Sequence, residues 1–295
     1  KDAVNRKTNQ SNIGVITGSN LCHEIMEVCT AQSFACCTLA SINVKKYLEK
    51  LTYDNGREIT TEWRYNYRKL WEATRRITRN LDIVIDINSY PVIECTENNT
   101  NYRPIGIGIQ GLADLFCMMR IPYLSSLAAE LDVNIAAVIY HAALTESCAR
   151  ATVFGKYNGF EGSPASHGRL QYDMWGVATP AMSNAPQHGY DDFKLDWAGL
   201  KADICARGLR NSLLVAYMPT ASTSILLGNN ESFEPYTSNI YSINGLTGKQ
   251  TTCNANMIYH LIELGIWTEN MSKIIGNNRG SIQSIAEIPN DVKEI

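Results

Sequence analysis

The residues best suited to chemistry lie in the segment Ser19-Asn20-Leu21-Cys22-His23-Glu24-Ile25, where one thiol stands between an amide and a carboxylate. In an extended segment successive side chains point to opposite faces, so Asn20, Cys22 and Glu24 would face the same way. That arrangement would bring a hydrogen-bonding amide, a sulfur and a proton acceptor into one small volume. A structural cysteine in a half-buried strand is the alternative, because free cysteine is among the most frequently buried residue types.

A second group of polar side chains follows the apolar segment 211–218, for which we expect a buried strand. The sequence Pro219-Thr220-Ala221-Ser222-Thr223-Ser224 places four hydroxyl groups within five residues at the carboxyl end of that strand. Ligands bind at this end of the strands in α/β sheets and barrels. If residues 222–227 start a helical turn, its N–H groups and the hydroxyls would bind a phosphate. A serine or threonine cap on an ordinary helix explains the same residues equally well.

The nine cysteines are an odd number at irregular spacing, without a CxxC pair. Neither a zinc site nor a disulfide framework is therefore expected, and no metal site is predicted. Cys37 follows Cys22 by fifteen residues (37 − 22 = 15), enough for a hairpin to return one thiol near the other. Cys37 could equally bond a cysteine elsewhere or simply pack, whereas a Cys36–Cys37 bridge would be strained. Cys117 and Cys148 lie on apolar helical faces and are expected to fill the core.

The 295-residue chain has an ordinary globular composition, with 45% hydrophobic residues, 19% charged residues and a net charge of −3. It has no basic patch, so a nucleic-acid partner is not expected. No signal peptide and no apolar run near ~18 residues is visible, so we expect no membrane span and a reducing, cytoplasmic environment.

Strands and helices alternate along the chain, which predicts the α/β class. The sequence predicts a strand within residues 35–44, a polar loop at 97–104, and helices at 63–87, 112–119, 127–154, 195–206, 258–264 and from 290 onward. Glycines at 106, 108 and 111 match the GxGxxG pattern of dinucleotide sites. We expect these glycines to permit close backbone packing instead, because no clean strand–turn–helix unit with an acidic partner ~20 residues on is visible.

Stretches distributed from end to end of the chain, taken together, resemble the large, catalytic subunit of class I ribonucleotide reductase. These stretches are Lys1-Asp2-Ala3 with Asn5-Arg6-Lys7, Ser19-Asn20-Leu21-Cys22-x-Glu24-Ile25, Cys37-x-Leu39-Ala40-Ser41, Arg103-Pro104-Ile105-Gly106-Ile107-Gly108-x-Gln110-Gly111-Leu112-Ala113-Asp114, Gln171-Tyr172-Asp173-Met174-Trp175, Met218-Pro219-Thr220-Ala221-Ser222-Thr223, Gly228-Asn229-Asn230-Glu231-Ser232, Glu234-Pro235-Tyr236-Thr237-Ser238-Asn239-Ile240-Tyr241 and Gly280-Ser281-Ile282-Gln283. The resemblance implies that residues 1–295 are part of a ten-stranded α/β barrel whose central finger loop carries the active thiol.

The resemblance also implies a role for each matching residue in reducing ribonucleoside diphosphates to 2′-deoxyribonucleoside diphosphates for DNA synthesis. Cys22 matches the thiyl-radical cysteine that removes the 3′-hydrogen of the substrate, and Glu24 matches the base that takes the 3′-hydroxyl proton. Asn20 matches the amide that orients the ribose hydroxyls, and Cys37 matches one of two cysteines that supply electrons. The substrate-binding residues implied are Asn20, Leu21, Cys22, His23, Glu24, Thr220, Ala221, Ser222 and Thr223.

The family resemblance further implies partners. No cofactor is expected on this chain; a dimetal small subunit would supply the radical, and thioredoxin or glutaredoxin would restore the thiols. We expect a homodimer of large subunits and an internal fragment that does not turn over alone. Compared with the family, it would lack the N-terminal part for ATP and dNTP effectors, the first barrel strands with the cysteine that pairs with Cys37, the paired tyrosines and the C-terminal cysteine tail.

Two other classes of function remain as alternatives. In a thiol-redox protein, Cys22 and Cys37 would exchange as a dithiol without a radical, but the hydroxyls at 220–224 would have no purpose. In a catalytically inactive homologue that binds a complete subunit, nothing would require Asn20, Cys22 and Glu24 together. Departures from the family pattern are Thr38 in place of the usual Asn, His23 within the thiol motif and a loop at 176–197 that is longer than expected.

Overall fold

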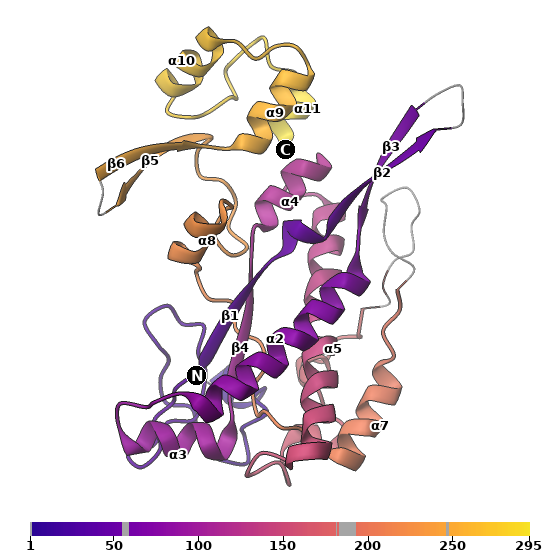
Figure 1. Ribbon diagram of the computed structural model, residues 1–295, viewed down its shortest axis with the longest axis vertical. Helices are drawn as coiled ribbons and strands as arrows, with labels where there is room; N and C mark the ends of the chain where they lie inside the picture. The colour runs from indigo at the N-terminus through magenta and orange to yellow at the C-terminus, as the bar shows by residue number, and fades with distance from the viewer. Residues whose placement is uncertain (1, 55–58, 181, 183–192, 246–247) are drawn as a thin grey trace. The chain divides into compact units, whose positions relative to one another are not determined.

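The computed structural model describes residues 2–54, 59–180, 182, 193–245 and 248–295 (Figure 1). The chain divides into two compact units, one formed by residues 1–109 and 133–220 and the other by residues 110–132 and 221–295. Most of the long loop expected at 176–197 lies outside the described residues. The elements of the first unit are α1 (Asp2–Asn5), β1 (Thr38–Asn43), the 3-10 helix η1 (Val44–Tyr47), β2 (Leu48–Asp54), β3 (Ile59–Tyr65), α2 (Tyr67–Ile87), α3 (Ile93–Tyr102), β4 (Ile105–Gln110), α5 (Ser126–Phe154), the 3-10 helix η2 (Pro164–His167), α6 (Gln171–Trp175) and α7 (Trp197–Arg207). β4 and α5 each begin or end in the second unit.

The strand β4 lies at the centre of the first unit, and all six of its residues are buried. On one side it pairs with β1, and Figure 1 shows the two strands running side by side. On the other side β4 lies alongside the segment 213–216. Ile107 and Val215 form a parallel bridge, and Ile107 N donates a hydrogen bond to Leu214 O at 3.0 Å. The predicted strand at 211–218 is therefore extended and joined to β4, although only Val215 forms a regular bridge. The α/β class is confirmed.

The glycines of β4 are explained by close backbone approach, as the sequence predicted. A Cβ atom on Gly106 would lie 2.5 Å from Leu39 Cδ2 and 3.1 Å from Cys37 Sγ, and one on Gly108 would lie 2.8 Å from Ala216 O. A strand, a single glycine in the left-handed region (Gly111, φ 78°) and the helix α4 (Leu112–Met119) do follow one another, which the sequence analysis did not expect. The helix α4 has the bounds that the sequence predicts, 112–119.

Replacing Gly106 by alanine should destabilise the protein by roughly 1–3 kcal/mol, because overpacking a filled strand face forces neighbouring side chains from their positions. Chemical unfolding of the variant and the parent measures the change. Gly18→Ala is the matched control, since nothing lies within 4 Å of a Cβ built there. Equal losses in both variants would contradict the packing argument.

The helices α2 and α5 pack beside each other in the first unit. Arg75 Nε and Arg79 Nε each donate to the buried Glu146 carboxylate at 2.9 Å, so one carboxylate on α5 joins two turns of α2. α2 starts later than predicted because Trp63 belongs to β3 and Asn66 caps the helix by accepting from Lys69 N at 2.9 Å. α5 is long and apolar enough to span a membrane by length and composition alone, contrary to the prediction that no such run exists. In this structure 61% of its most apolar window is buried inside the protein, as in a core helix.

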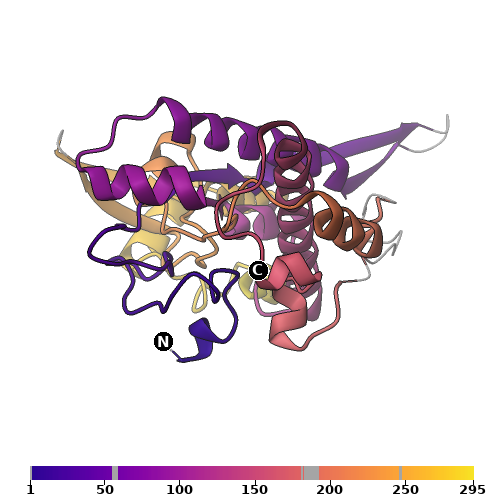
Figure 2. The ribbon, with the colours of Figure 1, turned by 90° about the horizontal axis from the view of Figure 1, so that it is seen from below.

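The predicted loop at 97–104 is wrong, because most of it belongs to the helix α3. Both views show α3 beside the end of α2 (Figures 1 and 2). Its polar residues are buried in contacts with other segments: Asn98 Nδ2 donates to Ser33 Oγ at 3.2 Å, and Asn99 Nδ2 donates to Tyr90 Oη at 2.9 Å. Tertiary hydrogen bonds thus favour a helix where the local sequence has the composition of a loop.

The second unit has its own apolar core. Its elements are α4, α8 (Ala221–Leu227), β5 (Ile240–Gly245), β6 (Gly248–Cys253), α9 (Ala255–Glu263), α10 (Glu269–Asn277) and α11 (Asn290–Glu294). The helices predicted at 258–264 and from 290 onward are confirmed as α9 and α11. The core residues are Met257, Leu261, Met271, Ile275, Ile282, Ile285, Ile288 and Val292.

Candidate active site

The thiol segment is a turn rather than the extended strand that the sequence predicted. His23 N donates to Asn20 O at 3.3 Å, and His23 has a left-handed backbone with φ of 67°. The side chain of Asn20 accepts from Ile25 N at 3.1 Å, which gives the backbone an alternative to strand pairing. Asn20 therefore holds the turn that carries Cys22, and the expected alternation of side chains across residues 20–24 does not occur. Leu21, Cys22 and His23 are all exposed.

Glu24 lies at the wall of a cavity of about 540 Å³ within the first unit. Of the thiol segment and the residues just after it, only Glu24 and Met26 line this cavity, together with aromatic side chains that include Tyr172 and Trp175. Glu24 Oε2 is buried and has no hydrogen-bond partner among the described residues. A carboxylate oxygen in this state can accept a proton or a hydrogen bond from a ligand in the cavity.

Cys37 lies directly before β1, in contact with the β4 backbone at Gly106. Burial raises the pKa of the Cys37 thiol, and the nearby Glu27, Cys36 and Glu24 raise that pKa further. Cys37 is thus held as a protonated thiol close to two carboxyl groups. All nine cysteines of the chain lie in described residues and are free thiols, including Cys36 and Cys37. Cys148 is buried as expected, and Cys117 is half-buried.

Glu27 is a buried carboxyl group near Cys36 and Cys37 that the sequence motifs did not indicate. Its side chain is only 3% exposed, and neither carboxyl oxygen has a hydrogen-bond partner of normal geometry among the described residues. Burial raises the pKa of Glu27 to about 8, and the nearby Gln10 side chain opposes this shift only in part. A glutamate placed between Met26 and Val28 in an apolar run was the available signal for a buried carboxyl group.

The hydroxyl segment forms the start of α8, so the helical turn that the phosphate-binding interpretation requires at 222–227 is present. Thr220, the last residue of the first unit, is buried and has φ of 59°, a left-handed conformation that β-branched residues rarely adopt. Ala221, Ser222 and Thr223 are exposed in the first turn of α8, in the second unit. The strained Thr220 is consistent with a functional constraint at this point of the chain.

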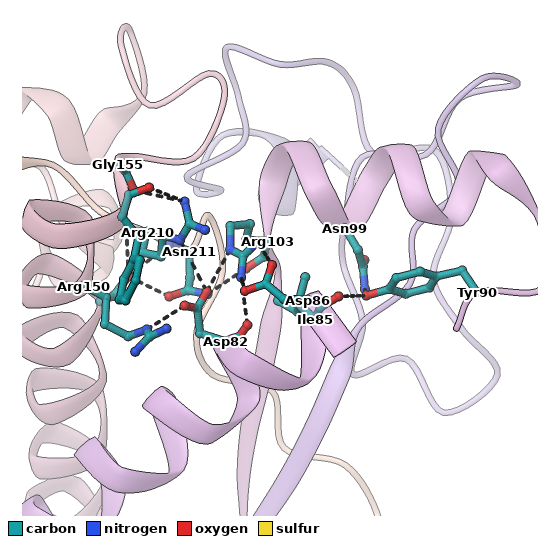
Figure 3. Close-up of polar contacts among 12 residues, drawn as sticks. Asp82, Ile85, Asp86, Tyr90, Asn99, Arg103, Arg150, Gly155, Arg210 and Asn211 are labelled. Carbon is teal, nitrogen blue, oxygen red and sulfur yellow. Dashed lines mark hydrogen bonds and ion pairs between the residues drawn. The ribbon is translucent and has the colours of Figure 1, made fainter. Parts of the chain in front are cut away.

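A buried ionic network holds the amino ends of β4 and of the 211–218 segment together (Figure 3). Arg103 Nε donates to Asp82 Oδ1 at 2.8 Å, and Asn211 Nδ2 donates to the same oxygen at 3.2 Å and to Arg103 O at 3.0 Å. Arg150 and Arg210 also pair with the Asp82 carboxylate. Because Asp82 is fully buried, this network fixes the register of β4 and of the 211–218 segment. β4 ends at Gln110, and the 211–218 segment leads to Thr220.

Comparison with known proteins places this arrangement in a family. The model of the family described as "Ribonucleotide reductase, barrel domain" matches residues 1–295, the whole chain. The chain belongs to the ribonucleotide reductase barrel-domain family. Membership of this family confirms the resemblance that the sequence motifs show. It also confirms that the fold is that of the barrel domain.

Relatives of this barrel-domain chain are large subunits of ribonucleotide reductases. The chain is 48% identical over 295 residues to the ribonucleoside-diphosphate reductase large subunit of Caenorhabditis elegans, covering all of this chain and 34% of the relative. It is 50% identical over 296 residues to that of Dictyostelium discoideum, covering all of this chain and 32% of the relative. The chain therefore spans about a third of the length of these relatives.

A solved structure has the same fold as this member of the family. The class Id ribonucleotide reductase alpha subunit of Actinobacillus ureae superimposes with a TM-score of 0.69 and 21% sequence identity, covering all of this chain and 45% of that one. Among the described residues β1, β4 and the 213–216 segment are the parts of such a barrel that lie side by side. The described strands form three two-stranded sheets.

Proposed function

We propose that residues 1–295 are part of the catalytic barrel of a class I ribonucleotide reductase large subunit. The whole protein reduces ribonucleoside diphosphates to 2′-deoxyribonucleoside diphosphates by thiyl-radical chemistry, for DNA precursor synthesis. The observation that carries this proposal is the thiol segment: an exposed Cys22 in an Asn20-held turn, followed by Glu24 with an unpartnered oxygen at a cavity. Family membership and relatives named as ribonucleoside-diphosphate reductases support it.

In this proposal Cys22 removes the 3′-hydrogen of the substrate as a sulfur radical and returns a hydrogen atom at the end. Glu24 takes the proton of the 3′-hydroxyl, for which it needs only hydrogen-bond reach to one oxygen. Asn20 orients the ribose hydroxyls, and its neighbours Leu21 and His23 contact the substrate through the turn. The exposure of Cys22 supports access of both substrate and radical to the sulfur.

Cys37 supplies one of the two electrons that the reaction needs. The 2′-hydroxyl leaves as water, and two thiols are oxidised to one disulfide, so atoms and electrons balance. Within this chain the partner of Cys37 is not Cys36, because a bridge between adjacent cysteines is strained. The partner is proposed to lie on a barrel strand outside residues 1–295.

Replacing Cys37 by serine in the full-length protein should stop multiple turnover with thioredoxin as reductant while leaving 3′-hydrogen abstraction intact. The reason is that Cys37 donates electrons, whereas Cys22 begins the reaction. Loss of tritium from 3′-labelled substrate measures abstraction, and chromatography of deoxynucleotides measures turnover. Continued cycling of the variant with thioredoxin would assign the reducing role to another cysteine.

Thr220, Ala221, Ser222 and Thr223 bind the substrate diphosphate in this proposal. The exposed first turn of α8 and the strained Thr220 support it, since backbone N–H groups and hydroxyls at such a turn suit an anion. The base of the nucleotide is contacted elsewhere.

Replacing Ser222 and Thr223 together by alanine in the full-length protein should weaken diphosphate binding by about one to two orders of magnitude. The expected loss takes the low end of the roughly 1.5–3 kcal/mol that each hydroxyl bond to a charged group contributes, because the backbone amides remain and still bind the anion. The loss should be similar for all four ribonucleoside diphosphates in calorimetric titration. The exchange Ser222→Thr with Thr223→Ser keeps both hydroxyls and is the matched control. A loss confined to one base would place the diphosphate at another loop.

The partners follow from the same proposal. A small subunit with a dimetal centre supplies the radical, thioredoxin or glutaredoxin reduces the disulfide, and two large subunits form a homodimer in the cytoplasm. ATP and dNTP effectors bind a part of the protein outside residues 1–295. Among the described residues no cluster of three or more His, Cys, Asp or Glu side chains could hold a metal ion.

A further inference from the structure

Two free thiols outside the proposed reaction face each other in the first unit. The Cys95 thiol lies near enough to the Cys36 thiol to raise the pKa of Cys36, and both residues are half-buried. Cys36 lies in the segment that leads into β1, and Cys95 lies in the first turn of α3. The backbone brings the same two segments together, because Phe34 N donates to Glu94 O at 3.0 Å.

The contact between these segments does not depend on the sulfur atoms. Asn98, one turn further along α3, donates from Nδ2 to Ser33 Oγ at 3.2 Å and to Val28 O at 3.5 Å. The segment that carries Cys36 is therefore held on α3 at several points. Residues 34–37 have no regular secondary structure, so small backbone adjustments there can bring the two sulfur atoms to bonding geometry.

The neighbouring thiols Cys36 and Cys37 have different surroundings. Cys37 Sγ lies beside Gly106 of β4, only 3.1 Å from where a Cβ on that glycine would be. Cys36 instead contacts Cys95 on α3. Because Cys37 lies beside β4 and Cys36 lies beside α3, the two thiols have separate neighbours.

We propose that Cys36 and Cys95 are a second dithiol pair, which hydrogen peroxide oxidises to a disulfide independently of Cys37. One thiolate attacks the peroxide O–O bond, which yields a sulfenic acid and one water. The other thiol then attacks the sulfenic sulfur and displaces a second water as the S–S bond forms. The two sulfurs together lose two electrons, and one peroxide becomes two waters. This step does not depend on nucleotide reduction.

Either thiol of the pair makes the first attack, and the other resolves the sulfenic acid. The resulting bond closes a loop between residues 36 and 95. Closing a loop of this kind restricts the unfolded chain, so the oxidised protein should unfold at a higher temperature.

The test treats the full-length protein with hydrogen peroxide, blocks the remaining thiols by alkylation and maps the peptides without reduction. Chymotrypsin cleaves after Phe34 and Tyr102, which separates the Cys36–Cys37 peptide from Cys22 and Cys29, and the Cys95 peptide from Cys117. We expect a disulfide-linked pair of these two peptides in mass spectra, which disappears on reduction. The rise in unfolding temperature should appear and disappear with it.

Single substitutions decide which neighbour forms the bond. The linked pair and the shift in unfolding temperature should persist in Cys37→Ser and be lost in both Cys36→Ser and Cys95→Ser. Cys36→Ser and Cys95→Ser are both conservative, and the same loss in both variants guards against a local folding defect in one of them. A linked pair that persists in Cys36→Ser and is lost in Cys37→Ser would overturn the proposal. So would a Cys95 peptide that is fully alkylated after peroxide treatment.

Discussion

Replacing Cys22 by serine in the full-length protein should abolish nucleotide reduction, with a loss of many orders of magnitude, while substrate binding survives. In this proposal the Cys22 sulfur is the atom that loses one electron and then attacks the ribose. The hydroxyl oxygen of a serine forms a radical far less readily than sulfur does. Because Cys22 is exposed in a turn closed by Asn20, a serine should leave the backbone unchanged.

The measurement is deoxynucleotide formation by the variant with the small subunit and thioredoxin, alongside titration with a ribonucleoside diphosphate. Cys29→Ser is the matched control, since Cys29 is also an exposed free thiol seven residues further along the same segment (29 − 22 = 7). That control should keep full activity. Measurable turnover by the Cys22→Ser protein would refute the assignment of Cys22.

Elements with strong local signals could be predicted from the sequence. The helix α4 was predicted with its observed bounds, and α5 within one residue, because an apolar run and a glycine at one end define each of them. The closely packed glycines of β4 were also predictable, since an alternating glycine pattern favours backbone approach. In these segments local preference and tertiary packing favour the same structure.

Two of the misses share a physical cause, which is asparagine side chains that bond to distant or unexpected groups. Asn20 accepts from Ile25 N and turns a segment that was predicted to be extended. Asn98 and Asn99 are buried in α3, where the composition predicted a loop. The hydrogen-bond partners of an asparagine cannot be derived from the local pattern, so both segments were assigned wrongly.

The sequence offered Cys22 and Glu24 as candidate site residues by their type and spacing, and the family resemblance added Cys37; these roles stay predictions. Their geometry could not be predicted, because only the structure places Glu24 at the cavity and Cys37 against Gly106. Glu27 was missed because burial of a single carboxyl group depends on the whole fold. Its proximity to Cys36 and Cys37 makes the pKa values of these two thiols depend on a residue outside the motif.

Replacing Glu27 by glutamine should stabilise the protein strongly at pH 8 and hardly at all at pH 4.5. Burial raises the pKa of Glu27 from 4.5 to about 8, so between these values the folded protein holds a proton that the unfolded chain releases. The contribution of Glu27 to stability is therefore fully present below pH 4.5 and is lost as pH rises to about 8. The loss is about 1.4 kcal/mol per pH unit, or roughly 4–5 kcal/mol over the whole interval.

Denaturant unfolding of the full-length variant and parent at pH 5, 6, 7 and 8 gives the difference in unfolding free energy directly. Groups common to both proteins, such as the buried His141 with its lowered pKa, cancel in this difference. The series stops at pH 8 because Glu27 is among the groups that raise the pKa of Cys36 and Cys37, so cysteine ionisation above that pH differs between variant and parent and does not cancel. Glu72→Gln, at an exposed glutamate of α2, is the matched control and measures the effect of the same substitution away from the buried site. A pH-independent difference for Glu27→Gln would mean that water or a partner group satisfies this carboxylate in the folded protein.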